Sequence, residues 1–236
     1  MQRVFLTATW ENLVMVNYIV DAALLLPYVP AKTTIDTYNG NVYISLVGFN
    51  FLNTKLAGIK IPFHSDFEEV NLRFYVQQET DNIVKRGVVF IKEIVPKPAI
   101  SFVANVFYRE KYSAMPMKHS IETNDDDLKF GYYWKNKNKW NSLEAVTHKE
   151  AVAINPGSEA EFIAEHYWGY SKHRERTYEY EVQHPKWNIY PVKAYTIKCD
   201  FEKLYGKHFS FLENAEPASV FVAKGSGIKV LSKTLL

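Results

Sequence analysis

Phe67-Glu68-Glu69-Val70-Asn71-Leu72-Arg73-Phe74-Tyr75-Val76 is the stretch that decides the fold, because it has the two-residue period of a β-strand. Side chains alternate between the two faces of a strand. One face carries the apolar residues Val70, Leu72, Phe74 and Val76, and the other carries the polar row Glu69, Asn71, Arg73 and Tyr75. Two interpretations fit this pattern: a half-buried antiparallel strand whose polar face meets water, or a strand whose polar row lines a barrel or cleft and holds a polar ligand. The spacing alone leaves both open.

The composition favours a β-rich fold in one domain. The chain has 236 residues, of which 47% are hydrophobic and 15% aromatic, with 16 Tyr and 15 Phe. Aromatic residues are enriched in strands, and β-barrels of this length often form single units. No repeat, linker or low-complexity block marks a boundary, so we expect one domain over residues 1–236.

Charge and cysteine content restrict the partners and the compartment. A formal net charge of +2 is too small for a nucleic-acid or acidic-membrane surface, so the expected partner is a small molecule or another protein, and a homo-oligomer stays open. The single cysteine, Cys199, allows no intrachain disulfide and fits a reducing compartment. The sequence shows neither an apolar stretch of membrane-spanning length nor a secretory leader, so we expect a cytoplasmic protein.

Local signals predict the other elements. Asn39-Gly40 predicts a type I′ turn between strands at residues 33–38 and 41–49. Ser158 and Glu161 have capping-box spacing, which predicts a helix over residues 159–167, and we expect this helix to cover the apolar face of the strand at 67–76. The remaining expectations are a helix capped by Asp21 through residue 26, a turn at 79–82, a strand or helix at 99–108, strands at 177–182, 188–197 and 218–231, a short helix at 200–205 and a last hairpin at 225–227.

Several classes of catalytic site leave no trace in the sequence. It has no glycine-rich phosphate loop, no His-Glu-x-x-His metal motif and no Gly-x-Ser-x-Gly nucleophile elbow. His166 and His173 could approach each other across a helix end, but aromatic-flanked histidines more often serve packing than metal binding. We therefore expect no metal and no cofactor.

A set of spaced motifs resembles a known family. These motifs are Trp10-Glu11-Asn12-Leu13, Val20-Asp21 with Leu26-Pro27 and Pro30, Asp36-Thr37-Tyr38-Asn39-Gly40, Phe67-x-Glu69-x-Asn71-x-Arg73-x-Tyr75-Val76, and His184-x-x-Trp187. Together they resemble the YqjF-like family of uncharacterised bacterial proteins. That family looks like a distant branch of the acetoacetate decarboxylase superfamily, whose members fold as a strongly curved antiparallel β-cone or barrel around a central cavity. The resemblance implies the same mainly β fold with a few short helices, and it favours the interpretation in which Glu69 and Arg73 face the cavity.

The sequence departs from the decarboxylases at their catalytic motif. There, Arg-Glu is followed by Pro-Lys-Lys, and the first lysine forms a Schiff base because burial and a neighbouring cation keep its amine neutral. Here the stretch reads Arg109-Glu110-Lys111-Tyr112-Ser113-Ala114-Met115-Pro116-Met117-Lys118. Met117 stands at the nucleophile's position after Pro116, one extra residue separates Pro116 from Arg109, and Lys118 holds only the second lysine's position. The resemblance therefore does not imply Schiff-base chemistry.

Three hypotheses for the function remain. The first is a cavity that binds a small polar or carboxylate-bearing molecule without covalent chemistry; the residues expected to bind it are Asn71, Arg73, Tyr75, Arg109 and Lys118. The second is an enzyme of lyase or isomerase type that acts on a keto or enol acid, with Glu69 as the catalytic proton-transfer group. The third is a structural or protein-interaction module. A raised pKa of Glu69 would favour the enzyme hypothesis, because a glutamate that acts as a general base near neutral pH needs a pKa above its ordinary value.

Overall fold

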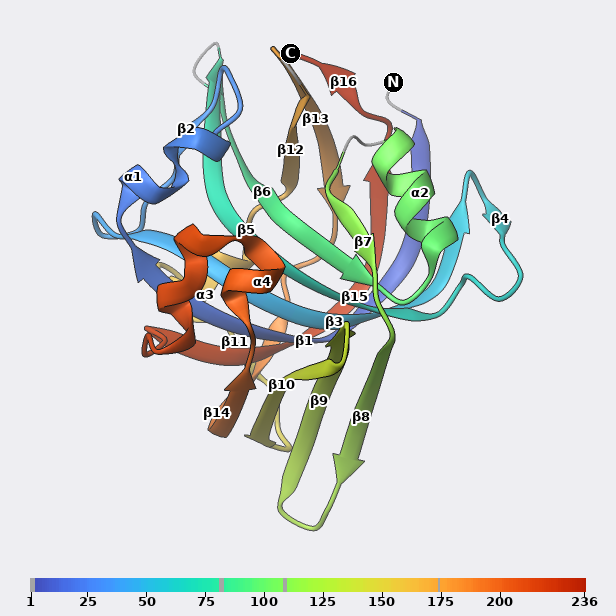
Figure 1. Ribbon diagram of the computed structural model, residues 1–236, viewed down its shortest axis with the longest axis vertical. Coiled ribbons are helices and arrows are strands. Elements are labelled where there is room, and N and C mark those ends of the chain that lie inside the picture. The colour runs from blue at the N-terminus through green and yellow to red at the C-terminus, as the bar shows by residue number, and fades with distance from the viewer. Residues whose placement is uncertain (1–2, 81–82, 108–109, 174) are drawn as a thin grey trace.

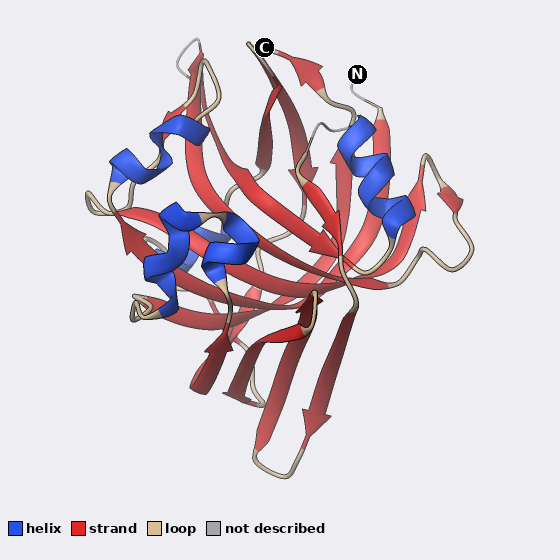
Figure 2. Cartoon of the chain, in the orientation of Figure 1, coloured by secondary structure: helices blue, strands red, loops and turns tan. Residues whose placement is uncertain are grey.

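The protein is built mainly from β-strands (Figure 2). The computed structural model describes residues 3–80, 83–107, 110–173 and 175–236. Its strands are β1 (Val4–Val20), β2 (Thr34–Ile35), β3 (Val42–Leu56), β4 (Ile59–Lys60), β5 (Phe67–Thr80), β6 (Ile83–Val95), β7 (Tyr112–Ala114), β8 (Met117–Thr123), β9 (Asp127–Asn136), β10 (Lys139–His148), β11 (Val152–Ala153), β12 (Trp168–His173), β13 (Arg176–Gln183), β14 (Asn188–Lys198), β15 (Ser219–Leu231) and β16 (Thr234–Leu235). Its helices are α1 (Ala22–Leu25), α2 (Pro98–Phe107), α3 (Glu159–Ala164) and α4 (Phe201–Tyr205), with 3₁₀ turns η1 (Leu26–Tyr28) and η2 (Lys207–Glu213).

The central strands close into a ring (Figure 1). Its order is β13–β12–β6–β5–β3–β1–β15, and β15 returns to β13 by pairing Val230 with Val182. Neighbours in this ring are antiparallel except β6 and β12, which run parallel with Trp168 opposite Gly87. The expected strongly curved β-barrel with a few short helices is confirmed, as a mixed sheet rather than a purely antiparallel one.

The apolar face of β5 packs outward, against helices near the C-terminal end of the sequence. Val70, Leu72 and Phe74 are fully buried and share one core cluster with Phe201 of α4 and Phe209 of η2. Both helices are drawn in orange in front of the sheet in Figure 1. The alternation in the sequence therefore predicted the buried outer face correctly, but the covering helices are α4 and η2.

The prediction that the helix after Ser158 covers this outer face is wrong. Ser158 does cap α3, accepting a hydrogen bond from the backbone N–H of Glu161 at 3.2 Å. The helix ends at Ala164, and Phe162 packs against the ring of Tyr75 on the opposite face of β5, with 5.5 Å between ring centroids. The helix therefore lies on the pocket side of β5, where Ala164 is part of the pocket lining.

The predicted hairpin around Asn39-Gly40 is correct at its turn and wrong in its strands. Asn39 (φ 50°) and Gly40 (φ 77°) have the two positive φ angles of a type I′ turn. Only Tyr38 and Asn41 pair across it. Since β3 already pairs with β1 on one edge and β5 on the other, it has no free edge, and β2 pairs with β5 instead.

The last predicted hairpin is also wrong, because residues 225–227 lie inside the continuous strand β15. Gly225 (φ 81°) pairs with Glu11 of β1 in unbroken register, and a Cβ there would lie 2.0 Å from the backbone oxygen of Trp10. This glycine therefore permits a close approach of the two strands and not a reversal. Residues 98–107 form a helix, which decides between the two alternatives for that segment. Strands β5 and β6 pair up to Thr80 and Ile83, while residues 81–82 of the predicted turn lie outside the described residues.

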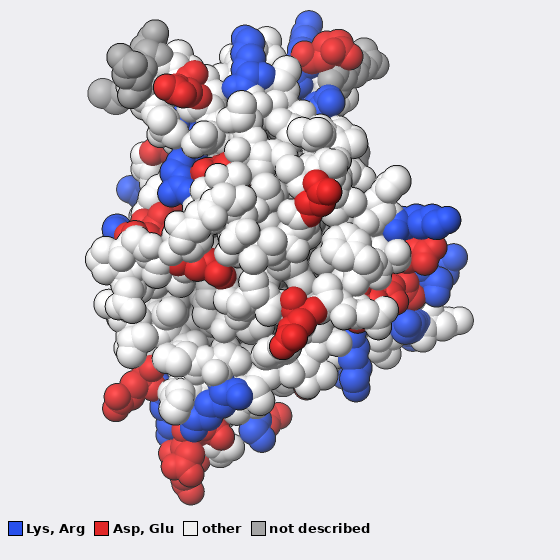
Figure 3. All heavy atoms as spheres, turned by 90° about the vertical axis from the view of Figure 1, so that its left-hand side faces the viewer, with Lys and Arg blue, Asp and Glu red and all other residues white. Residues whose placement is uncertain are grey.

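A second group of strands, β14, β10, β9 and β8, continues the sheet beyond β15 and projects downward in Figure 1. In the face shown in Figure 3, acidic and basic side chains lie near one another toward the edges, and the centre is uncharged except for a few separate acidic side chains. None of the helices in the described part of the chain has the length and apolar character needed to cross a membrane.

Candidate functional site

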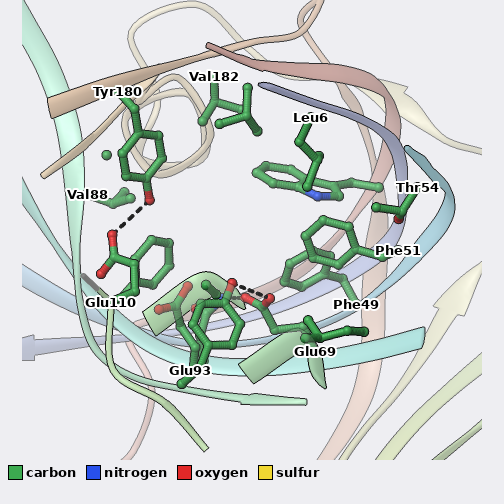
Figure 4. Close-up of a pocket in the computed structure, with 18 of the residues that line it drawn as sticks. Leu6, Phe49, Phe51, Thr54, Glu69, Val88, Glu93, Glu110, Tyr180 and Val182 are labelled. Atoms are coloured by element: carbon green, nitrogen blue, oxygen red, sulfur yellow. Dashed lines mark hydrogen bonds between the residues drawn. The ribbon is translucent and has the colours of Figure 1, made fainter. Parts of the chain in front are cut away.

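A pocket of about 310 Å³ lies inside the ring of strands. Much of its wall is aromatic: the rings of Trp10 and Phe49 are 5.3 Å apart, and Phe51 stacks on Phe67 with centroids 4.7 Å apart. Figure 4 shows Phe49 and Phe51 on the opposite side of the pocket from Glu110. A wall of this kind suits the apolar part of a small ligand, while a few polar groups fix its orientation.

Strand β5 turns most of its polar row into this pocket. Glu69, Asn71 and Arg73 line it and are only 2%, 1% and 8% exposed, so this face does not meet bulk water. Tyr75 is equally buried but lies beyond the lining, where its hydroxyl shares a 2.7 Å hydrogen bond with Oγ of Ser45. The structure thus brings three of the residues proposed from the sequence together, with Tyr75 packed behind them.

The neighbouring strand β6 adds a second buried carboxyl, Glu93, through a bulge. Phe90 pairs with Arg73, but the next pair is Lys92 with Leu72, so Ile91 is an extra residue in β6. The extra residue reverses the alternation. Glu93 therefore lies opposite Asn71 and lines the pocket, and Lys92 turns outward, where its amine donates to the backbone carbonyl of Leu204.

The segment after α2 completes an acidic cluster, defined here as Glu69, Glu93 and Glu110. Tyr112 begins β7, which pairs with β6 so that Tyr112 lies beside Glu93, and its hydroxyl donates to Oε2 of Glu69 at 3.0 Å. Nδ2 of Asn71 donates to the other oxygen of Glu69 at 2.8 Å.

The pocket's third carboxyl, Glu110, is held by a side chain from a distant strand. The hydroxyl of Tyr180 on β13 donates to Oε1 of Glu110 at 3.0 Å, as the dashed line in Figure 4 shows. The ring of Tyr180 fits only because residue 169 on β12 is glycine: a Cβ at Gly169 would lie 2.1 Å from Cζ of Tyr180. This glycine lets the tyrosine reach across the pocket.

Burial makes the acidic cluster weakly acidic. Removal from water raises the pKa of Glu69 to about 7, although hydrogen bonds from Asn71 and Tyr112 and the charge of Arg73 act to lower it. Burial raises the pKa of Glu110 to about 8, against the hydrogen bond from Tyr180. The pKa of Glu93 lies well above its ordinary value through burial and through the negative charges of Glu110 and Glu69. At neutral pH the cluster therefore holds protons.

Among the described residues that line the pocket, Arg73 is the one arginine or lysine. Among the described residues its guanidinium has no hydrogen bond or ion pair, and its Nε atom is buried without a partner. Its Cζ atom lies 5.7 Å from the ring centroid of Tyr75. An arginine presents five donors in a planar fork, so most of its hydrogen-bonding capacity is available to an occupant of the pocket.

A histidine forms part of the wall at α3. His166 follows α3, and its Nε2 atom lies 3.0 Å from Oδ2 of Asp36, which also accepts a 2.7 Å hydrogen bond from Nε of Arg86. Burial lowers the pKa of His166 to about 4, more than the hydrogen bond with Asp36 raises it. In the described chain no group of three or more His, Cys, Asp or Glu residues could hold a metal ion.

Two of the residues proposed from the sequence are not brought to this pocket. Lys118 lies outside the lining on β8, where it is exposed and its amine stands over the rings of Tyr133 and Trp140, 5.3 and 5.1 Å from their centroids. Arg109 lies outside the described residues. The sequence analysis did not propose Glu93, Glu110, Tyr112, Tyr180 or His166 as site residues. Of these, Glu110 carried a signal through the Arg-Glu motif, and His166 was considered only as a metal ligand together with His173.

Sequence comparisons place the chain in a family. Residues 7–227 match the DUF2071 family model, described as an uncharacterized conserved protein. The chain is 28% identical over 193 residues to the uncharacterized protein YqjF of Bacillus subtilis (strain 168). The aligned region covers 79% of this chain and 75% of that protein.

Solved structures share the fold at low sequence identity. Acetoacetate decarboxylase from Legionella pneumophila matches with a TM-score of 0.66 at 9% identity, covering 99% of this chain and 88% of that one. An acetoacetate decarboxylase-like enzyme from Sphingomonas wittichii RW1 gives 0.66 at 11% identity, with 98% and 93% covered. The enduracididine biosynthesis enzyme MppR, complexed with pyruvate, gives 0.67 at 12% identity, with 100% and 91% covered. The chain therefore belongs to the DUF2071 family and has an acetoacetate decarboxylase-like fold.

Proposed function

We propose that this protein binds a small carboxylic acid with a largely apolar body, non-covalently, in the pocket inside the ring of strands. The observation that carries the proposal is Arg73, a buried guanidinium that lines the pocket and has no hydrogen-bond or ion-pair partner among the described residues. A buried cation without a counter-charge is costly, and a carboxylate can satisfy a guanidinium with two parallel hydrogen bonds. The ligand's acid group therefore belongs at Arg73.

Two members of the acidic cluster, Glu93 and Glu110, do not oppose this assignment. Because the pKa of Glu93 lies well above its ordinary value and that of Glu110 is about 8, these groups are neutral at physiological pH and do not repel an anionic ligand. A protonated carboxyl also carries an O–H donor that can contact a second ligand oxygen. The aromatic wall around Phe49 and Phe51 accommodates the apolar body.

The pocket lining also supports binding without a Schiff base. None of the described residues that line it is a lysine. Lys118 stands on β8, away from the lining, and Met117 holds the position at which the decarboxylases carry their nucleophile. A lysine amine becomes a nucleophile at neutral pH only when burial or a nearby cation lowers its pKa, and exposed Lys118 lacks such burial.

A second candidate is an acid–base enzyme acting on a keto or enol acid, with Glu69 as the proton-transfer group. A pKa of about 7 suits proton transfer near neutral pH, and it is burial, not pairing with Arg73, that dominates the pKa of Glu69. Two proteins of the same fold point to such ligands, since one is named as acetoacetate decarboxylase and MppR is complexed with pyruvate. Proton exchange at the methyl group of pyruvate in D2O, followed by NMR, tests it: exchange that Glu69→Gln abolishes supports the enzyme, and no exchange contradicts it for this substrate.

Calorimetric titration with 3-phenylpropanoate tests the binding function. This probe carries one carboxylate and an aromatic body. We expect wild-type protein to bind it and Arg73→Met to bind it ten- to hundredfold more weakly, because a hydrogen bond to a charged group contributes about 1.5–3 kcal/mol. Arg176→Met, at an exposed position at the start of β13, is the matched control and should bind as wild type does. No binding to wild type, or equal affinity in Arg73→Met, contradicts the proposal.

A further inference from the structure

His166 has an unusual pair of environments for its two ring nitrogens. Its side chain is 1% exposed, and it lines the pocket. The Nε2 atom lies 3.0 Å from Oδ2 of Asp36, a residue that is not part of the lining, so the ring stands between Asp36 and the pocket. The Nδ1 atom is buried and has no hydrogen-bond partner. Leaving a buried acceptor unsatisfied destabilises the folded protein.

The hydrogen bonds around Asp36 determine where the proton of His166 is. Oδ1 of Asp36 accepts from the backbone N–H of Thr37 at 2.9 Å, and Oδ2 accepts from Nε of Arg86 at 2.7 Å. Both partners can only donate. Burial acts to raise the pKa of Asp36, but its hydrogen bonds with His166 and Arg86 and their charges together lower it, so Asp36 is an ionised acceptor. Nε2 of His166 must therefore donate to it. Since the pKa of His166 is about 4, the imidazole is neutral, and Nδ1 carries a bare lone pair.

The surrounding rings fix the imidazole next to the anion-binding group of the pocket. The ring of His166 lies 4.7 Å from that of Tyr75 and 5.0 Å from that of Phe162. Tyr75 is also the ring over which the Arg73 guanidinium stands, at 5.7 Å. His166 and Arg73 are therefore neighbours across one aromatic side chain. His166 can accept a hydrogen bond from a ligand in the pocket, whereas Arg73 can donate several.

His184, another histidine of the lining, shows what a packing histidine looks like in this protein. Its Nδ1 atom lies 2.9 Å from the backbone carbonyl of Pro185, and its ring stacks on Trp187 with centroids 4.1 Å apart. The Nδ1 atom of His184 thus has a partner within the protein, whereas that of His166 has none. Packing and this contact account for His184, whereas the same kinds of contact leave the Nδ1 atom of His166 unpaired.

We propose that Nδ1 of His166 accepts a hydrogen bond from a hydroxyl group of the ligand, so that the pocket selects carboxylic acids that also carry a hydroxyl, such as a hydroxy acid or the enol form of a keto acid. This inference rests on the proposed function for the carboxylate but adds a second recognition group. Asp36 and Arg86 are positioning residues in this arrangement, because they act only through the tautomer of His166.

Affinity for matched probes tests the proposal. The probes are 3-phenylpropanoate and its 2-hydroxy and 3-hydroxy derivatives, which differ only in the hydroxyl and its position. We expect one hydroxy acid to bind wild-type protein about tenfold more tightly than the parent acid, since the new hydrogen bond satisfies a buried acceptor. His166→Gln should lose this preference, because its amide can still donate to Asp36 but has no atom at the Nδ1 position. His148→Gln, at the exposed end of β10, should retain it.

A second measurement on wild-type protein avoids any folding defect of the variant. Two-bond ¹H–¹⁵N NMR reports the tautomer of each histidine, and we expect Nδ1 of His166 to be unprotonated and to shift upfield when the hydroxy acid, or the neutral alcohol 3-phenylpropan-1-ol, is added. No hydroxyl preference together with an unmoved Nδ1 signal overturns the inference, as does a protonated Nδ1 in the free protein. A different result overturns only the carboxylate assignment: the affinity for 3-phenylpropanoate is the same in wild type and Arg73→Met, while the alcohol still shifts the Nδ1 signal of His166.

Discussion

The hydroxyl of Tyr180 donates a 3.0 Å hydrogen bond to Oε1 of Glu110, joining two residues that are far apart in the sequence across the wall of the pocket. Both side chains are buried. The bond acts to lower the pKa of Glu110, which burial has raised to about 8. This tyrosine therefore keeps one member of the acidic cluster within reach of ionisation at physiological pH.

Tyr180→Phe should raise the pKa of Glu110 further, by about one to two units, because a hydrogen bond to a charged group contributes about 1.5–3 kcal/mol and one pKa unit corresponds to about 1.4 kcal/mol. The pKa is measured by ¹³C NMR of the glutamate carboxyl carbons across a pH titration. Tyr178→Phe is the control on the same strand, since Tyr178 stands against Lys233 instead of lining the pocket. An unchanged Glu110 titration in Tyr180→Phe would show that the bond does not form in solution.

Glu110 also predicts how stability depends on pH. The folded protein keeps the Glu110 proton until about pH 8, whereas the unfolded chain loses it near 4.5, so the unfolded chain binds fewer protons in between. The contribution of Glu110 to stability is therefore complete below about pH 4.5 and is lost as the pH rises to about 8, on the order of 1 kcal/mol per pH unit.

Urea unfolding of wild-type protein and Glu110→Gln at several pH values isolates this contribution. The free energy of unfolding of wild type should fall relative to the variant between pH 5 and 8, because glutamine does not titrate. Glu122→Gln, at an exposed position in β8, should follow wild type. A constant difference between wild type and Glu110→Gln would mean that Glu110 titrates normally. His166, whose lowered pKa acts in the opposite direction on the acid side, is present in all three proteins and cancels.

Gly40→Val should destabilise the protein by roughly 1–2 kcal/mol, because Gly40 has a φ of 77° and a β-branched residue resists positive φ. A Cβ at Gly40 meets nothing within 4 Å, so the cost is confined to the backbone. Gly227→Val is the matched control, since Gly227 also has open space but no positive φ. If both variants lost the same thermal stability, the positive φ of Gly40 would not be the cause of the destabilisation.

The strand at 67–76 shows how far sequence can lead to this site. Its alternation predicted which residues share a face, the family resemblance favoured the polar face as the inner one, and the structure places Glu69, Asn71 and Arg73 in the pocket. The same rule misplaces Glu93, because the extra residue Ile91 reverses the faces of β6 and no local pattern in the sequence marks that bulge.

The other parts of the site depend on contacts between segments far apart in the chain. Tyr180 reaches Glu110 across 70 positions, and His166 meets Asp36 across 130. These pairs form because the strands close into a ring. The alternation of residues along a single strand does not indicate which distant strands meet in that ring. The same limit explains the error about α3, whose apolar residues indicated a covering helix but not which face of β5 it would cover.

Incubation with acetoacetate and borohydride should leave the protein's mass unchanged. Lys118 is exposed on β8 and lies over Tyr133 and Trp140, so it lacks the burial that would make its amine nucleophilic. Intact mass spectrometry detects a reduced Schiff base as a stable adduct. A modified Lys118 that disappears in Lys118→Arg would show that covalent chemistry has been retained on this fold.

A crystal structure of the protein with 3-phenylpropanoate tests the central claim most directly. We predict the carboxylate within hydrogen-bonding distance of the Arg73 guanidinium, the phenyl ring against the aromatic wall formed by Phe49 and Phe51, and no bond between the ligand and any lysine. A pocket that stays empty at saturating ligand, or a carboxylate that turns away from Arg73, would contradict the account.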